Sequence, residues 1–332
     1  MQDIKDFEPL WGEWRSVEML GQGTFGRVYK MVKRDLDTEY YSAVKHLSLP
    51  RTSGEEKDLY SEGLVTDQEI LRIYYDDVLK DLRSEINLCY KLKGITNIVS
   101  YEDHCICPKV SGFGYDIFIK MELLTSLQDR IKEGGLKVWD VIKLGEDICR
   151  ALTVLRREKI IHRDIKPSNI FVNSGGDYKL GDFGVSWSME RMVNSMSVKG
   201  TFNYMAPEVA KGSIGDYRVD IYALGLVLYR MLNKNRGPFL PLPTHAVTSE
   251  MNRQAQERRL RGEALPPPAE IDKELAGIIL KACAYRPEDR WENAEEMGKA
   301  LAEYRVSASS KQLGFNVVSI KSEFETDKIL AN

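Results

Sequence analysis

The amino-acid sequence predicts an α+β fold in two lobes: a small N-terminal lobe built on an antiparallel sheet with one main helix, and a larger, mainly helical C-terminal lobe. Residues 14–47 and 95–122 carry alternating or continuous apolar runs separated by glycine-rich and polar turns, which is typical of strands. A helical pattern from about Thr66 to Lys93 lies between them. After residue 125 apolar residues recur at helical spacing, as in 138–157, 271–284 and 292–305.

The composition is that of an ordinary globular protein. The chain has 332 residues, 43% of them hydrophobic and 29% charged, with a formal net charge of -3 at pH 7. A charge this small gives no sign of a general affinity for nucleic acid or anionic lipid. No apolar stretch reaches the roughly 18 residues that a membrane span needs. Five scattered cysteines favour reduced thiols. We therefore expect no nucleic-acid partner, no membrane span and a cytoplasmic location.

The remaining segments are mostly polar. Residues 50–63, with Pro50 and Gly54, are predicted to form a loop. Residues 233–270 are predicted to be irregular, and no periodic element is predicted after residue 306. The segment from Asp220 to Leu232 is apolar nearly all round, which predicts a helix buried inside its lobe.

A glycine-rich turn lies between the first two predicted strands. Gly21, Gly23 and Gly26 form a G-x-G-x-x-G pattern, and glycines let a backbone lie close over phosphates because no Cβ is in the way. Dinucleotide-binding folds share the pattern, but there a helix follows, whereas here a strand follows. Taken alone, the motif fits a nucleotide site and a plain tight turn equally well.

A lysine and a glutamate are predicted to act with this turn. Ala43 and Lys45 lie on one face of a strand, so the small side chain of Ala43 could pack against a flat nucleotide base while the lysine reaches the phosphates. The alternative is a lysine that points at water, the usual position of this residue. The face shared with Ala43 argues against it. Glu85, on the helix that follows, is the expected counter-ion of Lys45.

The most specific motif is His-Arg-Asp-Ile-Lys-Pro-Ser-Asn, from His162 to Asn169. Asp-Phe-Gly begins at Asp182, 18 residues after Asp164, and Ala-Pro-Glu ends at Glu208. With these residues the chain resembles the eukaryotic-type (Hanks-type) serine/threonine protein kinases. It also resembles the bacterial members of that family from Firmicutes, in residues 94–104, 121–127 and 235–241.

The resemblance implies a bilobal, protein-kinase-like domain with a long insert. The implied boundaries are an N-terminal extension at 1–11, a kinase domain at 12–305 with N-lobe 12–122 and C-lobe 126–305, and a C-terminal tail at 306–332. The 40 residues from Lys45 to Glu85 exceed the family's usual connection, so the insert is expected at 48–80. We interpret the insert either as a lever on the Glu85 helix or as a solvated insertion without a control role.

The resemblance also assigns roles to individual residues. The cofactors would be ATP and Mg²⁺, with Mn²⁺ as a substitute, and catalysis would rest on positioning and charge neutralisation. Asp164 would accept the proton of the substrate hydroxyl, and Lys166 would neutralise charge on the γ-phosphate. Asn169 and Asp182 would bind the metal through oxygen atoms. With Met121 as gatekeeper, the implied ATP-binding residues are Leu20, Gly21, Gly23, Gly26, Val28, Ala43, Lys45, Met121, Glu122, Leu124 and Phe171.

The acceptor and the regulation follow from the same resemblance. Lys166 and Thr201 are typical of kinases that phosphorylate serine and threonine in protein substrates, and dual specificity for tyrosine stays open. The loop after the metal-binding motif is expected to carry an activating phosphate, on Ser197 first and Ser195 second. Autophosphorylation would place it there, and Arg163 would bind it.

Some charged residues are expected to build the large lobe rather than to act on substrate. Glu208 and Arg290 would form a buried ion pair. Asp220 would hydrogen-bond the backbone of the catalytic loop.

Two other functions are weighed against an active protein kinase. A catalytically silent pseudokinase scaffold would lack one of Lys45, Asp164, Asn169 and Asp182, and all four are present. A small-molecule phosphotransferase would lack the Ala-Pro-Glu segment. The sequence therefore favours an ATP-dependent kinase that phosphorylates proteins on serine or threonine.

Overall fold

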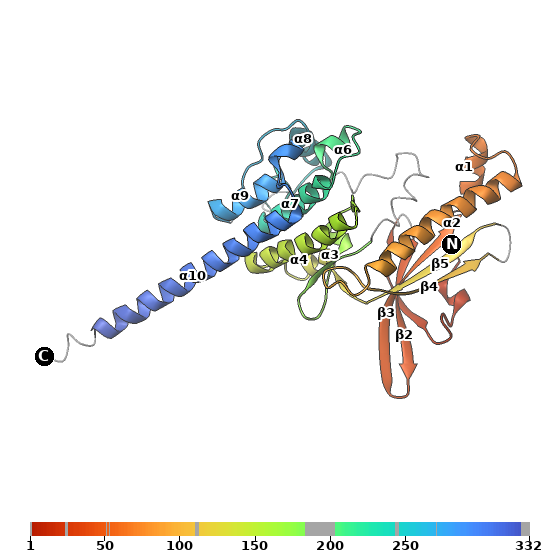
Figure 1. The fold of residues 1–332 in the computed structure, drawn as a ribbon, viewed down its shortest axis with the longest axis horizontal. Coiled ribbons are helices and arrows are strands. Elements are labelled where there is room, and N and C mark those ends of the chain that lie inside the picture. Colours follow the sequence, from red (N-terminus) through yellow and green to blue (C-terminus); the bar gives the residue numbers. More distant parts are fainter. Residues whose placement is uncertain are drawn as a thin grey trace. The chain divides into compact units, whose positions relative to one another are not determined.

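The computed structural model forms two compact units (Figure 1). Unit 1 comprises Met1–Leu127 and Asn169–Lys199, and unit 2 comprises Gln128–Ser168 and Gly200–Asn332. The structure describes residues 2–23, 26–50, 52, 54–109, 113–182, 203–242, 246–269 and 271–326, with side chains to residue 310. An antiparallel sheet dominates unit 1 and helices dominate unit 2, so the predicted α+β class is confirmed.

Unit 1 is built on a five-stranded antiparallel sheet with the strand order β1-β2-β3-β5-β4. The strands are β1 (Arg15–Gly23), β2 (Gly26–Asp35), β3 (Thr38–Leu49), β4 (Tyr101–Pro108) and β5 (Tyr115–Met121). Ala43 of β3 lies opposite Met121, and Lys45 lies opposite Ile119. Because side chains alternate along a strand, Ala43 and Lys45 share a face, as the sequence predicts.

Two helices, α1 (Glu55–Ser61) and α2 (Gln68–Lys91), pack on this face of the sheet (Figure 1). Asp67 begins α2, and its carboxylate accepts hydrogen bonds from two N–H groups of the first turn. The predicted loop at 50–63 is wrong, because α1 forms within it. The helix has one buried residue, Leu59, so its sequence shows no apolar stripe.

The interpretation of the insert as a solvated segment is also wrong. Its apolar side chains are buried in one hydrophobic cluster with residues of β3 and β5: Leu59, Val65, Leu71, Tyr75, Val78 and Leu79. Full burial of such a side chain stabilises a fold by about 1.5–3 kcal/mol. The insert therefore belongs to the core of unit 1. Its role as a lever on Glu85 stays a prediction.

The opposite face of the sheet has a core of its own. The 3-10 helix η1 (Ile4–Phe7) and Trp14 pack there on strand residues that include Phe118. His46 and Asp116 are both buried in this region, and His46 Nε2 lies 2.8 Å from Asp116 Oδ1. Residues expected in the N-terminal extension are thus part of the fold of unit 1.

A small three-stranded sheet completes unit 1. Its strands are β6 (Thr125–Ser126), β7 (Ile170–Val172) and β8 (Tyr178–Leu180), and the 3-10 helix η2 (Pro167–Asn169) directly precedes β7. The Leu180 N–H donates to the oxygen of Asn97, and the Val99 N–H donates to the oxygen of Leu180, both at 2.9 Å. These bonds fix the position of Leu180, two residues before Asp182 in the chain.

The chain from residue 127 onward is mainly helical. The helices that the structure describes after β6 are α3 (Leu127–Lys132), α4 (Val138–Arg157), α6 (Pro207–Ala210), α7 (Arg218–Leu232), α8 (Ser249–Leu260), α9 (Lys273–Ala282), the 3-10 helix η4 (Pro287–Asp289) and α10 (Ala294–Thr326). As predicted, α7 is buried along nearly its whole length. Within the part of the chain that the structure describes, no helix is both long and apolar enough to cross a bilayer.

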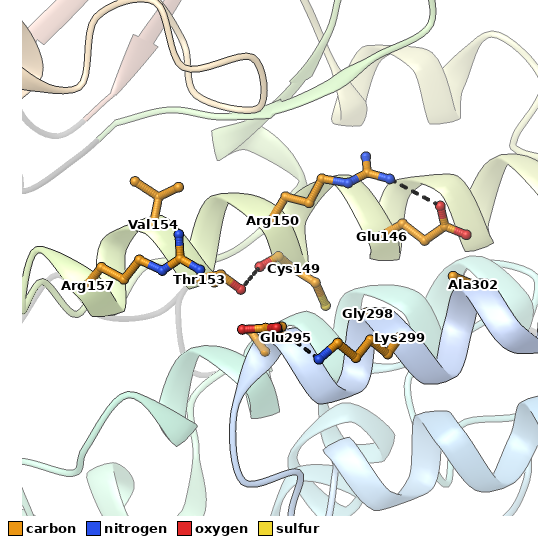
Figure 2. Close-up of a pocket in the computed structure, with 11 residues that line it drawn as sticks. Glu146, Cys149, Arg150, Thr153, Val154, Arg157, Glu295, Gly298, Lys299 and Ala302 are labelled. Carbon is orange, nitrogen blue, oxygen red and sulfur yellow. Dashed lines mark hydrogen bonds and ion pairs between the residues drawn. The ribbon is translucent and has the colours of Figure 1, made fainter.

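Helices α4 and α10 pack closely in unit 2. A Cβ added to Gly298 of α10 would lie only 3.1 Å from the Cβ of Cys149 on α4. Beside this contact lies a cavity of about 420 Å³ lined by both helices (Figure 2). None of the residues that the sequence assigns to the active site lines this cavity.

Two later segments differ from the predictions. The stretch predicted as irregular, 233–270, contains α8, which buries only Ala255 and Arg259 and so has no apolar stripe. Helix α10 continues to Thr326, where no periodic element was predicted.

Candidate active site

The glycine-rich turn joins β1 to β2 in unit 1, with Gly23 opposite Gly26. A Cβ added at Gly21 or Gly23 would meet no described atom within 4 Å, so the backbone there borders open space. At Gly26 an added Cβ would lie 2.3 Å from the main-chain oxygen of His46. The first two glycines thus leave an approach to the backbone, whereas the third is required by the pairing of β2 with β3.

Lys45 is buried on β3 and forms an ion pair with Asp182. A buried ammonium group needs an opposite charge, and Asp182 supplies it. Burial raises the pKa of the Cys89 thiol to about 11, Lys45 opposes this rise, and Glu85 and Asp182 add to it. Lys45, Glu85 and Asp182 therefore lie within electrostatic range of one thiol. A direct pair between Lys45 and Glu85 stays a prediction.

The two expected metal ligands come from adjacent parts of unit 1. Asn169 is 4% exposed, and its main-chain oxygen accepts a hydrogen bond from the Gly181 N–H at 2.9 Å. A Cβ at Gly181 would lie 2.7 Å from Val99 and 2.9 Å from Phe171, so only glycine fits. Asp182 follows with a left-handed backbone, φ 59°. Such strain persists where the surrounding structure holds it, often at functional sites.

The donor chemistry of this pair suits a hard divalent cation. Amide and carboxylate oxygens are the ligands that Mg²⁺ accepts, usually together with phosphate oxygens and water. Among the described residues, no group of three or more His, Cys, Asp or Glu side chains could hold a metal. By this chemistry Asn169 and Asp182 would bind such a cation together with phosphate oxygens and water.

The residues expected around adenine lie at β1, β2 and the end of β5. Leu20 is 46% exposed, which leaves its side chain available to a ligand. Val28 lies opposite Gly21 on one side and Lys45 on the other. Met121, the expected gatekeeper, ends β5 opposite the buried Ala43.

The chain after β5 is held by polar contacts. The Glu122 N–H donates to the oxygen of Ser100 at 3.1 Å, and the Glu122 carboxylate lies 2.7 Å from Lys179 Nζ. Glu122 would therefore bind a base through its main-chain carbonyl. Leu124 lies in the segment between β5 and β6, and Phe171 packs against Gly181.

The segment from His162 to Ser168, which is expected to be the catalytic loop, belongs to unit 2. Lys166 Nζ is 2.8 Å from Asp164 Oδ2, and the two side chains are 28% and 16% exposed. The Asp220 carboxylate of α7 accepts hydrogen bonds from the N–H groups of His162 and Arg163 at 2.8 Å each. These bonds hold Arg163 at φ 65°, a costly conformation for a residue with a side chain. Burial raises the pKa of Asp220. Its predicted contact with the loop backbone is confirmed.

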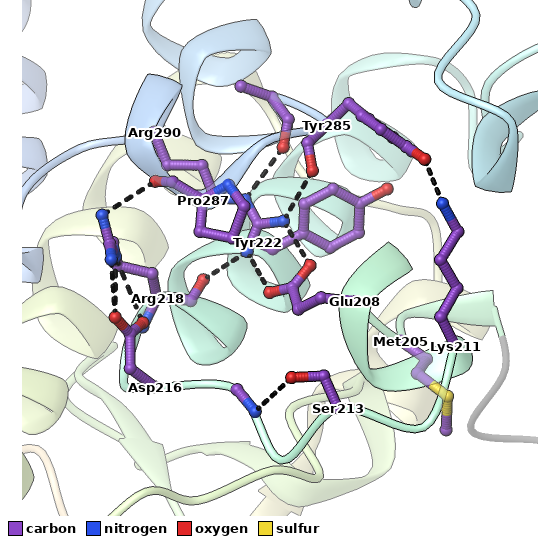
Figure 3. A network of polar contacts seen from close by, with 12 residues as sticks. Met205, Glu208, Lys211, Ser213, Asp216, Arg218, Tyr222, Tyr285, Pro287 and Arg290 are labelled. Carbon is purple, nitrogen blue, oxygen red and sulfur yellow. Dashed lines mark hydrogen bonds and ion pairs between the residues drawn. The ribbon is translucent and has the colours of Figure 1, made fainter.

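A second charged cluster in unit 2 is complete without any ligand (Figure 3). The Arg290 guanidinium donates to both carboxylate oxygens of Glu208 at 2.7 Å. It also donates to the main-chain oxygens of Ala284, Arg218 and Tyr285. The planar guanidinium matches a carboxylate in this way. The predicted ion pair is confirmed, and its role is to hold α6 to the chain around η4.

Three residues with predicted roles lie outside the described part of the chain. They are Thr201 and the expected phosphorylation sites Ser195 and Ser197.

The sequence did not indicate a polar pocket of unit 2 between α7 and α8, about 190 Å³ in volume. Its arginines, Arg230, Arg236 and Arg259, come from two helices and a loop, so no contiguous motif marks them.

Comparison with known protein families gives one match over most of the chain. Residues 14–301 match the family described as the protein kinase domain. The match covers most of both units and every residue assigned above to nucleotide, metal or catalysis.

Individual relatives are bacterial kinases. A probable serine/threonine-protein kinase from Clostridium perfringens is 34% identical over 206 residues, 58% of this chain and 29% of that protein. Serine/threonine-protein kinase PknB from Mycobacterium tuberculosis is 33% identical over 190 residues, 54% of this chain and 29% of that protein. Tyrosine-protein kinase MasK from Myxococcus xanthus is 41% identical over 147 residues, 43% of this chain and 21% of that protein. The chain thus matches less than a third of the length of these relatives.

Proposed function

This chain belongs to the protein kinase family, and we propose on that premise that it transfers the γ-phosphate of ATP to serine or threonine hydroxyls of other proteins. The observation that carries the proposal is the pair of Asp164 and Lys166, whose Oδ2 and Nζ atoms are 2.8 Å apart and whose side chains are partly exposed. A carboxylate within reach of a hydroxyl acts as a general base, and an ammonium group beside it neutralises phosphate charge.

Unit 1 supplies the groups that would hold ATP and Mg²⁺. The open backbone at Gly21 and Gly23 fits a phosphate chain, and the buried Lys45 would bind its oxygens. The oxygen donors of Asn169 and Asp182 fit Mg²⁺, with Mn²⁺ as a substitute. When bound, the cation neutralises charge on the phosphates.

Serine and threonine are proposed as acceptors because Lys166 stands at the His-Arg-Asp-x-Lys position typical of such kinases. Two of the three relatives above are named for the same activity. MasK is named as a tyrosine kinase, so an experiment must distinguish phosphorylation of serine or threonine from phosphorylation of tyrosine.

The proposal includes regulation and location. We propose autophosphorylation at Ser197 first and Ser195 second, with Arg163 as the cation that binds the phosphate. The fixed backbone of Arg163 supports this role, because a residue whose backbone is already ordered loses less entropy on binding. A cytoplasmic location is supported by five free cysteines.

One experiment separates this function from its alternatives. The chain is incubated with Mg²⁺ and γ-labelled ATP, together with a generic protein substrate and a mixture of small-molecule hydroxyl and amine acceptors. We expect label on protein and its loss with Asp164→Asn. Label only on small molecules would indicate a small-molecule phosphotransferase, and label on neither would indicate a pseudokinase scaffold.

A further inference from the structure

Two cysteine side chains lie side by side on β4, an edge strand of the five-stranded sheet of unit 1 (Figure 1). Cys105 and Cys107 are two residues apart, so both side chains point to the same face of the strand. Their Sγ atoms are 3.5 Å apart. Because β4 is last in the strand order, its backbone can adjust more readily than that of a central strand. Two sulfur atoms are thus held in contact at the margin of the sheet.

The pair lies on the face of the sheet that packs on η1, not on the face that carries Lys45. Cys105 lies opposite Phe118 on β5, and Cys107 lies opposite Asp116. Both cysteines pack against the hydrophobic cluster that contains Phe118. Both side chains are partly exposed, so a small reagent in the solvent can reach the sulfur atoms.

A packing role accounts for only part of this arrangement. Free cysteine is among the most buried residue types and behaves as a small apolar side chain. Cys149 and Cys283 fit that description, because both are buried in unit 2. Cys105 and Cys107 are partly exposed, and filling space on a sheet does not require two sulfur atoms in contact. Their proximity therefore points to a reaction between them.

The two thiols differ in their surroundings. Burial raises the pKa of Cys107 to about 11, and both the hydrogen bond to Cys105 and the negative charge of Asp116 add to this rise. Cys107 therefore keeps its proton at neutral pH and can donate it toward Cys105 Sγ. Because the thiolate is the reactive form of cysteine, Cys105 is the sulfur that reacts first.

The strand geometry permits a bond between the two sulfur atoms. Residues two apart in a strand have Cα atoms about 6.4–6.8 Å from each other, and disulfides join Cα atoms up to about 6.8 Å apart. The Sγ atoms would approach from 3.5 Å to about 2.0 Å. Side-chain rotation with a small adjustment of the edge strand supplies this movement. Exposed disulfides are the more easily reduced ones, so the bond would be reversible.

We propose that Cys105 and Cys107 form a redox modification site, at which a hydroperoxide oxidises the two thiols to a disulfide within β4. The reactant is a peroxide small enough to reach partly exposed sulfur atoms, and hydrogen peroxide is the simplest one. In a reducing compartment such a bond is transient, as in proteins that sense oxidants. The inference goes beyond the proposed function and does not depend on it.

The reaction has two steps that balance. The Cys105 thiolate attacks one oxygen of hydrogen peroxide, the O–O bond breaks, and Cys105 becomes a sulfenic acid. The hydroxide that leaves takes up a proton and becomes water. Cys107 then attacks the sulfenic sulfur, the S–O bond breaks and the S–S bond forms, while the proton of Cys107 leaves with the second water. The two thiols lose two electrons, and the peroxide gains them.

Mass spectrometry of the whole chain after treatment with hydrogen peroxide tests the proposal. The reduced protein is treated at neutral pH, unfolded with an alkylating reagent and digested with trypsin, whose peptide 94–109 carries both cysteines. We expect this peptide to lose two hydrogen atoms and both alkylation sites, and dithiothreitol to restore them. Cys89, whose pKa burial raises to about 11, should be oxidised roughly 10-fold more slowly or less.

Single serine substitutions separate the two roles. Cys107→Ser should stop at a sulfenic acid on Cys105, which dimedone labels. Cys105→Ser should give roughly 10-fold less dimedone label on Cys107, because that thiol keeps its proton. Cys89→Ser is the matched control and should form the disulfide at the wild-type rate. Thermal unfolding checks that each variant is folded. Should a variant not fold, the wild-type peptide 94–109 decides alone.

Three results would overturn the proposal. The first is full alkylation of peptide 94–109 under conditions that oxidise Cys89. The second is conversion of its cysteines to sulfinic or sulfonic acid without an S–S bond. The third is a disulfide between two chains, seen as a dimer on a non-reducing gel. None of these measurements uses phosphate transfer, so their failure would leave the proposed function standing.

Discussion

The Glu208–Arg290 cluster and the Asp164–Lys166 pair lie in the same unit, but they differ in how far their charged groups are buried and bonded within the protein. Every N–H group of the Arg290 side chain has an acceptor within the protein, and that side chain is 0% exposed. Asp164 and Lys166 are 16% and 28% exposed, so a substrate can reach both. A buried charge with a complete set of protein partners supports the fold, whereas a partly exposed pair can act on a ligand.

In unit 1 a similar contrast in exposure separates the two faces of one strand. Lys45 and His46 are neighbours on β3, so their side chains point to opposite faces. His46 and Asp116 are 0% and 1% exposed, whereas Asp182, the partner of Lys45, is 32% exposed. The face that packs on η1 is structural, and the face toward α2 carries the residues assigned to ATP.

The largest effect on catalysis is expected from Asp164→Asn. Loss of the base should lower turnover by roughly 10²- to 10⁴-fold. Stability should hardly change, because the side chain is partly exposed and Asp220 still holds the loop. Single-turnover phosphate transfer and thermal unfolding measure the two quantities. Near-normal turnover would show that Asp164 does not act on the substrate hydroxyl.

Arg290→Ala should lower stability and leave turnover unchanged. Removing one partner of a buried ion pair typically costs about 3–5 kcal/mol, because the other charge is left uncompensated. Urea unfolding should show this loss, while the folded fraction keeps its turnover.

Arg253→Ala is the control for this variant. Arg253 pairs with Glu250 and Glu257 on the exposed side of α8, so its removal should not change stability measurably. If Arg290→Ala lost turnover without losing stability, Arg290 would belong with the residues that act on substrate.

A smaller, pH-dependent loss of stability is expected from Asp116→Asn. Burial raises the pKa of Asp116, but the hydrogen bond and charge of His46 oppose this, and the net pKa lies below its usual range. A carboxyl with a depressed folded pKa contributes stability that is complete above its unfolded value, about 3.9, and is lost as pH falls through the folded value.

The substitution should therefore lower the free energy of unfolding by about 1–3 kcal/mol at neutral pH. The difference from wild type should shrink below about pH 4. Thermal unfolding of both proteins as a function of pH measures it. A difference that stays constant over the whole range would mean that the charge of Asp116 does not contribute.

Residues could be assigned to catalysis from the sequence because phosphoryl transfer restricts residue types within short motifs. Asp164, Lys166 and Asn169 lie within six residues of the chain, and in the structure Asp164 forms an ion pair with Lys166. The ion pair of Glu208 with Arg290 could also be predicted, although 82 residues separate the partners.

Other elements could not be predicted, since their burial does not follow an apolar stripe. Helix α8 buries an arginine, Arg259, through bonds to main-chain and hydroxyl oxygens. Helix α1 has only Leu59 to indicate that it packs. The polar pocket between α7 and α8 is lined by both helices, the loop between them and Asn203, so only the folded chain brings its arginines together.

Phosphoamino-acid analysis of a labelled protein substrate tests the proposed activity most directly. The substrate is incubated with Mg²⁺, γ-labelled ATP and either wild type or Asp164→Asn, and then hydrolysed. We expect phosphoserine or phosphothreonine with wild type and their loss with Asp164→Asn. Phosphotyrosine as the sole product, or equal label with both proteins, would contradict a serine/threonine kinase that uses Asp164 as its base.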